Sequence, residues 1–344
     1  MKEIFFLFVV ILFLSGCGRN DRRTPLWQVQ LKARAYADVI AESEIFYAFS
    51  QGGEVIAAQI KTGKAIWKRT LPEPILGTPA FSVDSIFVAT HQGAVVRLRK
   101  KDGSQVWEKR LNGPFIAPVA IFNSLILIPS ESGTLYALDS ARGSERWKLT
   151  GQKKFNTRPV VEGNRILIGG WEKQMFSLKE DGSVDWQFHA SDIITEDAVV
   201  FRNVVFFGSY DHFVYALEVQ TGKLIWRHPA VRPSNLVILS LKRKDSAPSA
   251  ELVFASGTNL VYVSPESGKV IRVSKFGKII SRLYANGSDL YVVSNNVYRI
   301  NPEGTGTSLV IDAPHPIFKL TFATGMILAL DDLYSIYGYA RLQD

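Results

Sequence analysis

The chain has 344 residues, of which 47% are hydrophobic and 21% charged, and its formal net charge is +8. This composition supports a substantial buried core and excludes an intrinsically disordered chain. Because there is one cysteine, an intrachain disulfide and a cysteine-based metal cluster are excluded as well.

The N-terminal segment has the features of an export signal. Lys2 supplies a positive charge and is followed by an unbroken apolar run from Ile4 to Leu14. A run of this length is typical of a signal peptide and is too short for a permanent transmembrane helix. We therefore expect residues 1–16 to be a signal peptide.

The apolar run ends in Leu14-Ser15-Gly16-Cys17, which resembles the lipobox of bacterial lipoproteins. The resemblance implies cleavage before Cys17 and acylation of that residue, and several acyl chains give stable membrane anchoring. The alternative is an incidental cysteine after an ordinary signal peptide. By the sorting rule of enterobacterial lipoproteins, Gly18 favours the outer over the inner membrane. Residues 17–25 are expected to be a polar tether, and 26–344 the folded domain.

The folded domain carries an internal repeat of about 40 residues. Six tryptophans mark it at intervals of 40, 40, 40, 39 and 40 residues: Trp27, Trp67, Trp107, Trp147, Trp186 and Trp226. Five glycines each precede a tryptophan by four residues: Gly63, Gly103, Gly143, Gly182 and Gly222. Only Trp171 lies outside this register. We interpret the phased residues as structural rather than ligand-binding.

Each repeat is typical of four short β-strands. In the third repeat, the runs 118–121, 125–128, 135–138 and 145–149 are separated by turns rich in Asn, Ser, Gly and Asp. No long stretch of helical periodicity is visible. A hairpin that ends in a left-handed position favours glycine. The tryptophan four residues later then lies on the outermost strand, where we expect it to cover the gap between neighbouring blades.

Counting the repeats predicts an all-β fold, an eight-bladed β-propeller of four-stranded antiparallel blades. Blade 6 has an insertion at Lys242–Ala250 and Arg272 at the tryptophan position, and blade 7 is degenerate at Tyr298–Gly304. Blade 8, at about Ile317–Ala340, has only three strands. We expect the N-terminal strand Leu26–Leu31 to supply the fourth, which closes the ring and leaves no edge strand open to aggregation.

The segments from Ala58 to Trp67 and from Ala216 to Trp226 resemble the A-x-D-x-x-T-G-x-x-x-W repeat of the pyrroloquinoline-quinone (PQQ) propeller family. Two kinds of protein share this repeat: periplasmic quinoprotein dehydrogenases, and BamB-type lipoproteins of the outer-membrane β-barrel assembly machinery. The dehydrogenases are usually longer and use a vicinal cysteine pair, a carboxylate base and a calcium site. This chain has one cysteine and no long insertion, so we predict no enzyme activity and no cofactor.

Other chemistry has little support in the sequence. The five histidines lie in different repeats, and none is at metal-ligand spacing from another, so no metal site is expected. Phosphate-binding loops, nucleophile elbows and zinc-protease motifs are missing. The basic residues are spread along the repeats and are not clustered with aromatic residues, which argues against nucleic-acid binding.

One face of the propeller is the expected site for a protein partner, because the connections between blades and the loops joining second and third strands lie together there. Aromatic and arginine side chains often anchor interfaces, and the BamB resemblance implies binding through inter-blade loops of the middle blades. Trp171 is the strongest candidate, since it lies off the repeat register. The alternative is that the candidates plug the central channel or pad neighbouring blades. The full set of candidates is Phe155, Arg158, Trp171, Ile193, Ile194, Tyr210 and His212.

The sequence therefore predicts a non-catalytic outer-membrane lipoprotein on the periplasmic face. Its propeller is expected to be a monomeric protein-interaction scaffold, with the outer-membrane β-barrel assembly protein as partner. A lipoprotein of the same fold that binds another envelope protein or a glycan is the second hypothesis. A quinoprotein-like enzyme is the third.

Overall fold

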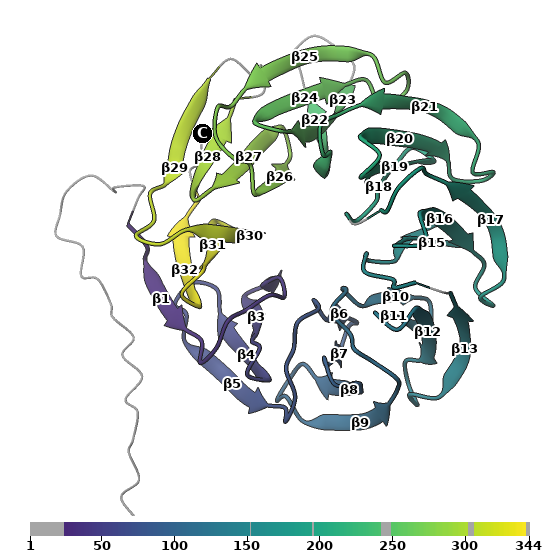
Figure 1. The fold of residues 1–344 in the computed structure, drawn as a ribbon. Coiled ribbons are helices and arrows are strands. Elements are labelled where there is room, and N and C mark those ends of the chain that lie inside the picture. Colours follow the sequence, from purple (N-terminus) through teal and green to yellow (C-terminus); the bar gives the residue numbers. More distant parts are fainter. Residues whose placement is uncertain (1–23, 152, 195, 242–248, 302–305, 342–344) are drawn as a thin grey trace, which may run out of the picture.

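The computed structural model describes residues 24–151, 153–194, 196–241, 249–301 and 306–341. Cys17, the expected signal peptide and most of the expected tether lie outside these residues. The described part forms eight antiparallel sheets of four strands each, arranged in a ring (Figure 1). No helix in this part is long and apolar enough to cross a membrane. The predicted eight-bladed propeller is confirmed.

The first four blades follow one another along the chain, each running from the channel to the rim. Blade 1 consists of β2 (Ile40–Glu42), β3 (Ile45–Phe49), β4 (Glu54–Gln59) and β5 (Ala65–Thr70). Blade 2 consists of β6 (Ala80–Phe81), β7 (Ser85–Ala89), β8 (Ala94–Arg99) and β9 (Gln105–Arg110). Blade 3 consists of β10 (Ala120–Phe122), β11 (Leu125–Pro129), β12 (Thr134–Asp139) and β13 (Glu145–Thr150). Blade 4 consists of β14 (Val160–Glu162), β15 (Arg165–Gly169), β16 (Gln174–Leu178) and β17 (Val184–His189).

The remaining blades complete the ring. Blade 5 consists of β18 (Val199–Phe201), β19 (Val204–Ser209), β20 (Phe213–Glu218) and β21 (Leu224–Pro229). Blade 6 consists of β22 (Ser234–Leu241), β23 (Ser249–Ser256), β24 (Asn259–Val263) and β25 (Val270–Lys275). Blade 7 consists of β26 (Arg282–Asn286), β27 (Asp289–Ser294), β28 (Asn296–Ile300) and β29 (Thr307–Ile311). Blade 8 consists of β30 (Ile317–Ala323), β31 (Met326–Asp331), β32 (Ser335–Ala340) and, outermost, β1 (Trp27–Gln30).

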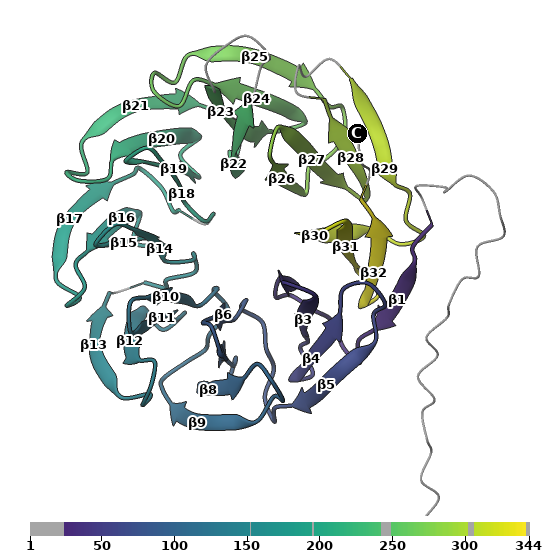
Figure 2. The ribbon, with the colours of Figure 1, turned by 180° about the vertical axis from the view of Figure 1, so that it is seen from behind.

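The ring is closed by the N-terminal strand, as the repeat count predicts. β1 pairs antiparallel with β32, with Trp27 opposite Gly338 and Gln30 opposite Ser335. Both views of the ribbon place β1 between β32 and β5 of blade 1 (Figures 1 and 2). The two ends of the described chain are therefore held in one sheet, and β32 has a neighbour on each side.

The core consists of apolar clusters between neighbouring blades rather than one central cluster. One cluster combines Tyr47 and Val55 of blade 1 with Ile86 and Val96 of blade 2. The same arrangement joins blade 8 to blade 1, with Trp27 buried in the cluster. Strands two and three of blades 1 and 2 are almost fully buried because both faces of each sheet are covered by a neighbouring sheet.

The phased tryptophans and glycines lock neighbouring blades together at six of the eight interfaces, from blades 8 and 1 round to blades 5 and 6. A Cβ atom on Gly103 would lie 2.6 Å from Trp67 Cε3, so only glycine leaves room for the indole of the preceding blade. The five phased glycines also have φ between +69° and +83°, the left-handed region expected for this turn. Each indole N–H donates to a backbone carbonyl of the next blade at 2.7–3.2 Å: Trp27 to Ile60, Trp67 to Lys100, Trp107 to Ser140, Trp147 to Glu180, Trp186 to Val219 and Trp226 to Pro265.

Two local details differ from or extend the sequence expectation. The first strand of blade 3 begins at Ala120, not at Pro118. Residues 118 and 119 still belong to the connection between blades, and the Val119 N–H donates to the Thr78 carbonyl of the neighbouring connection.

In blade 6, Arg272 occupies the tryptophan register opposite Tyr262. Its guanidinium lies 3.8 Å from the centroid of the Tyr262 ring.

Candidate protein-binding face and central channel

The connection between blades 4 and 5 is held between loops of both blades. The Ile194 N–H donates to the carbonyl of Gly170 in the β15–β16 loop, at 3.2 Å. The Tyr210 N–H of the β19–β20 loop donates to the Ile193 carbonyl, at 3.0 Å. The connections and the second-to-third-strand loops therefore lie on one face, and these hydrogen bonds make three segments a continuous surface.

Four of the predicted residues line this surface, which we call the blade 4–5 patch: Trp171, Ile193, Tyr210 and His212. Trp171 and Tyr210 are 37% and 51% exposed, unusually high for large aromatic side chains. Ile193, which lies between these two residues in the sequence, is half-buried. His212 is exposed. The Lys154 ammonium lies 4.0 Å from the centroid of the Trp171 ring, which fixes the indole by a cation–π contact.

Charged groups surround the blade 4–5 patch. Lys154 also pairs with Glu131, at 2.9 Å, and Lys173 lies 3.3 Å from Asp192. The backbone N–H of Ile193 hydrogen-bonds the Asp192 carboxylate and, with the nearby Lys173, lowers the pKa of Asp192. An apolar centre with a polar, charged perimeter is the usual anatomy of a protein interface.

Phe155 and Ile194 do not belong to this surface, which corrects the prediction for these two residues. Phe155 is 1% exposed and packs edge-on against Phe176, at 6.1 Å between ring centroids. Ile194 is fully buried against Gly169, where an added Cβ would lie 2.6 Å from Ile194 Cγ2. Both side chains turn inward because the connection itself needs apolar groups to seal the end of each blade.

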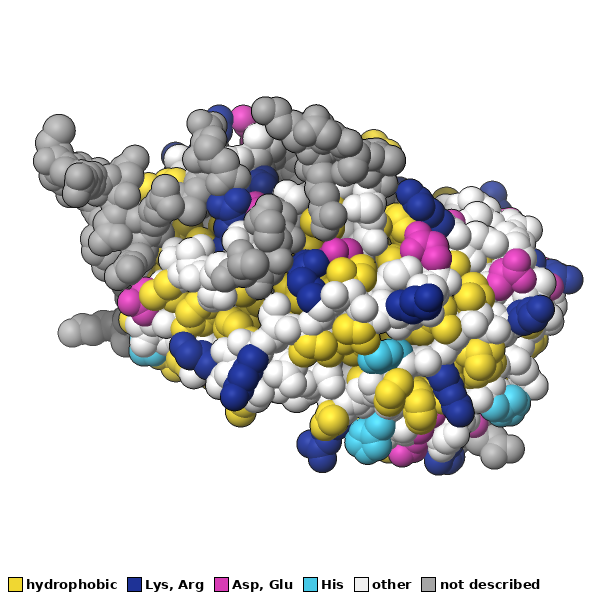
Figure 3. Space-filling view, turned by 90° about the horizontal axis from the view of Figure 1, so that it is seen from above, with side chains coloured by type: hydrophobic (Ala, Val, Ile, Leu, Met, Phe, Trp, Pro, Cys, Tyr) yellow, Lys and Arg dark blue, Asp and Glu magenta, His cyan; other side chains and the backbone are white. Residues whose placement is uncertain are grey.

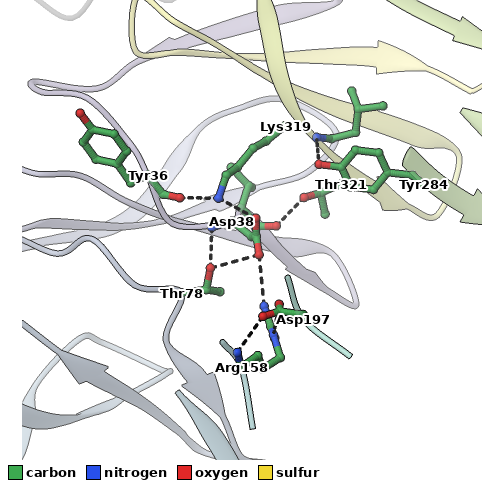
Figure 4. A network of polar contacts seen from close by, with 10 residues as sticks. Tyr36, Asp38, Thr78, Arg158, Asp197, Tyr284, Lys319 and Thr321 are labelled. Carbon is green, nitrogen blue, oxygen red and sulfur yellow. Dashed lines mark hydrogen bonds and ion pairs between the residues drawn. The ribbon is translucent and has the colours of Figure 1, made fainter. Parts of the chain in front are cut away.

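Arg158 points into the central channel instead of the outer face, as the channel alternative anticipates. Its backbone N–H donates to Asp197 Oδ1 at 2.7 Å, and its Nε lies 3.4 Å from Asp197 Oδ2. Its Nη2 reaches Asp38 Oδ2, at 3.3 Å, from a connection three blades away (Figure 4). Arg158 thus ties opposite parts of the ring together across the channel.

Asp38 is the centre of this network. It accepts a hydrogen bond from Thr78 Oγ1 at 3.1 Å and lies 2.8 Å from Lys319 Nζ (Figure 4). Burial opposes ionisation of Asp38, but the charge and hydrogen bond of Lys319, helped by nearby arginines, outweigh it and lower the pKa of Asp38. Burial also lowers the pKa of Lys319, which Asp38 partly offsets.

The charged residues surround a cavity of about 340 Å³ at the ring centre. Its lining comes from the innermost strand, or the connection before it, of every blade, and includes Asp38, Thr78, Asn156, Glu196, Arg282 and Lys319. Within the described chain, no group of three or more His, Cys, Asp or Glu side chains is arranged to hold a metal ion.

The sequence reasoning did not identify this network. Asp38 and Lys319 are 281 positions apart and meet only because β30 and the connection before β2 line the same channel. The available signal was Lys319 inside the mostly apolar run Ile317–Phe322, which the repeat pattern does not explain. A charged residue there predicts a buried counter-charge, but not which one.

A second apolar surface lies on the rim. Exposed aliphatic side chains of β21 and β25 are Leu224, Ile225, Val270, Ile271 and Val273. Viewed from the side that is uppermost in Figure 1, apolar side chains on the rim alternate with lysine and arginine side chains (Figure 3). These are outermost strands, so the rim surface and the channel lie at opposite ends of each blade.

Eight four-stranded blades, six of whose interfaces are locked by a glycine turn and an outer-strand tryptophan, define a propeller of PQQ-like repeats. The model of the family described as "Outer membrane protein assembly factor BamB" matches residues 19–120 and 101–309. The chain belongs to this family.

Individual relatives agree with this assignment. A segment of 97 residues is 27% identical to the outer membrane protein assembly factor BamB of Legionella pneumophila and covers 25% of this chain and 25% of that protein. The structure of BamB from Moraxella catarrhalis superposes with a TM-score of 0.77 at 16% identity, over 92% of this chain and 99% of that one. The structure of the computationally designed Ika8 protein superposes with a TM-score of 0.75 at 12% identity, over 91% of this chain and 98% of that one. At these identities the two structures are evidence for the fold.

Proposed function

We propose that the protein is a non-catalytic scaffold for outer-membrane protein assembly. In this role the blade 4–5 patch binds a protein of the β-barrel assembly machinery. The observation that carries the proposal is the exposed aromatic pair Trp171 and Tyr210, held on either side of a fixed inter-blade connection. Rigid aromatic side chains bury large areas at small entropic cost, which suits them as anchors of an interface. Membership of an assembly-factor family supports the kind of partner.

The patch is tested by replacing Trp171 with Ala and measuring co-purification of the β-barrel assembly protein from detergent-solubilised outer membranes. Loss of an anchoring aromatic residue is expected to weaken binding at least about tenfold. Thermal stability should change little, because the indole is 37% exposed and belongs to none of the buried clusters between blades of the described chain. Ile225→Ala on the rim is the matched control, since Ile225 is 46% exposed and lies outside the patch.

If the assembly protein is absent from the wild-type eluate, the proposed partner is wrong, and a different envelope protein or a glycan becomes the hypothesis to pursue. If it is present and Trp171→Ala retains it as well as Ile225→Ala does, the partner stands and the patch is wrong. A large loss of stability in Trp171→Ala would instead make the indole a core residue.

The proposal includes a lipid anchor at Cys17 that holds the propeller on the periplasmic face of the outer membrane. Its support is the lipobox-like sequence before that residue. Replacing Cys17 with Ser should move the protein from the membrane to the soluble fraction, because a folded propeller without acyl chains has no comparable membrane affinity. Cell fractionation with immunodetection measures this. Continued tight membrane association of the variant would contradict acylation at this position.

A further inference from the structure

The central channel contains two ionisable side chains that form no direct ion pair with another described residue. The first is Arg282, at the start of β26. Lys319 and Arg158 have Asp38 and Asp197 as partners. The exposed Arg282 side chain lines the cavity and forms no hydrogen bond or ion pair with another described residue, although its charge contributes to the lowered pKa of Asp38.

The second is Glu196, from the connection between blades 4 and 5. Its carboxyl group lines the same cavity and has the Asn235 backbone N–H as a hydrogen-bond partner, but it forms no ion pair with a described residue. Burial raises the pKa of Glu196, and the nearby Arg282 charge opposes this. The two charges are therefore close enough to interact electrostatically, but the side chains form no ion pair or hydrogen bond with each other.

A third polar group faces the same space. The side-chain oxygen Oδ1 of Asn156 is buried and accepts no hydrogen bond from any described residue. Asn156, Glu196 and Arg282 all line this cavity. The cavity thus offers one planar cation and two acceptors, and its volume of about 340 Å³ lies within the range of small-molecule sites.

We propose that this cavity binds a small zwitterion, an α-amino acid or a dipeptide, with its carboxylate on Arg282 and its ammonium group between Glu196 and Asn156. A guanidinium matches a carboxylate with two parallel hydrogen bonds. An ammonium group donates three hydrogen bonds and suits a carboxylate together with an amide oxygen. A purely anionic ligand would leave the carboxylate of Glu196 and the buried Oδ1 of Asn156 without donors, which is costly for the buried oxygen. A purely cationic ligand would leave the Arg282 guanidinium without a carboxylate partner.

The test uses the full chain, purified in detergent, and three probes with the same dipeptide backbone: alanyl-alanine, its N-acetyl derivative and its C-terminal amide. Binding is measured by saturation-transfer NMR and by calorimetric titration. Alanyl-alanine should bind, and each blocked probe should bind at least about tenfold more weakly, because each loses a charged hydrogen bond. Equal binding of all three probes, or none at millimolar concentration, would overturn the proposal.

Two variants assign the ends of the ligand. Arg282→Gln should weaken the binding of alanyl-alanine about tenfold or more, to an affinity close to that of the C-terminal amide for the wild-type chain. Glu196→Gln should weaken the binding of alanyl-alanine but leave the affinity for the N-acetyl probe unchanged. Arg227→Gln on β21 is the matched control, since Arg227 is an exposed strand arginine on the rim. Unchanged binding in Arg282→Gln would overturn the assignment. If a variant fails to fold, which its thermal unfolding reveals, the blocked probes on the wild-type chain still decide.

Discussion

At the scale of single residues, glycine and tryptophan act as one unit in this fold. The phased glycine supplies a left-handed turn and also a flat surface for the indole of the preceding blade. Gly103 and Gly287 separate these two roles. Both have a left-handed backbone, with φ of +70° and +67°, but only Gly103 has an indole against it.

We therefore predict that Gly103→Ala destabilises the protein more than Gly287→Ala does. The change at Gly287 should cost about 1 kcal/mol for the left-handed backbone alone, because no atom lies within 4 Å of the new Cβ. The change at Gly103 should cost a further ~1–3 kcal/mol, since the Cβ overlaps the ring of Trp67. Chemical denaturation measures both. Equal losses would show that the turn, and not indole packing, requires the glycine.

Asp38 is the residue on which the channel network depends most. Asp38→Asn leaves Lys319, which is 7% exposed, without its counter-charge. We expect a loss of about 2–4 kcal/mol near neutral pH. Lys319→Met should cost less, because Asp38 keeps Arg158 and Thr78 as partners. A larger loss in Lys319→Met than in Asp38→Asn would contradict this account.

The pH dependence of Asp38→Asn follows from the lowered pKa of Asp38. A carboxyl group whose pKa is lower in the folded protein adds stability above its unfolded pKa, near 3.8, and loses it as the pH falls through the folded value. The difference between wild type and variant should therefore be constant near neutral pH and shrink below about pH 3.8. Unfolding free energies measured across that range test it, and a difference that persists in acid would count against ionic pairing.

At the scale of elements, β1 is distinctive because it joins the last blade from the other end of the chain. Trp27 is 1% exposed, stacks on Phe46 of blade 1 at 5.3 Å and covers Gly338 of β32. It therefore stabilises both the sheet of blade 8 and the contact with blade 1. Trp67 has the same register but is only half-buried.

Trp27→Ala is predicted to be the more damaging of the two truncations. Removal of the fully buried Trp27 indole should lower the free energy of unfolding by about 3–5 kcal/mol. Trp67→Ala should lower it by less, because that indole is only half-buried. Hydrogen exchange at the β32 amides should accelerate in Trp27→Ala, because β32 becomes an edge strand when β1 detaches. If those amides remained as protected as in Trp67→Ala, β1 would not depend on its tryptophan for docking.

At the scale of the whole molecule, the propeller separates three surfaces by geometry. Loops of one face carry the blade 4–5 patch, the innermost strands and connections line the charged channel, and the outermost strands carry exposed aliphatic side chains. Partner binding at the patch and ligand binding in the channel are accordingly independent proposals. The Trp171 and Arg282 variants should each affect only one of them.

The blade number, the strand order and the closure by Trp27 could be predicted from the sequence, because they depend on a local pattern repeated about every 40 residues. It also marked Trp171, whose position off the register no blade contact explains. The burial of Phe155 and Ile194 and the contact of Arg158 with Asp38 became visible only in the folded protein. Such outcomes depend on which way a loop side chain turns and on contacts between distant blades, and neither is encoded in a local pattern. For the same reason the sequence did not predict the grouping of Arg282, Glu196 and Asn156. These residues come from different blades and line one cavity only because the ring brings the inner edges of the blades together.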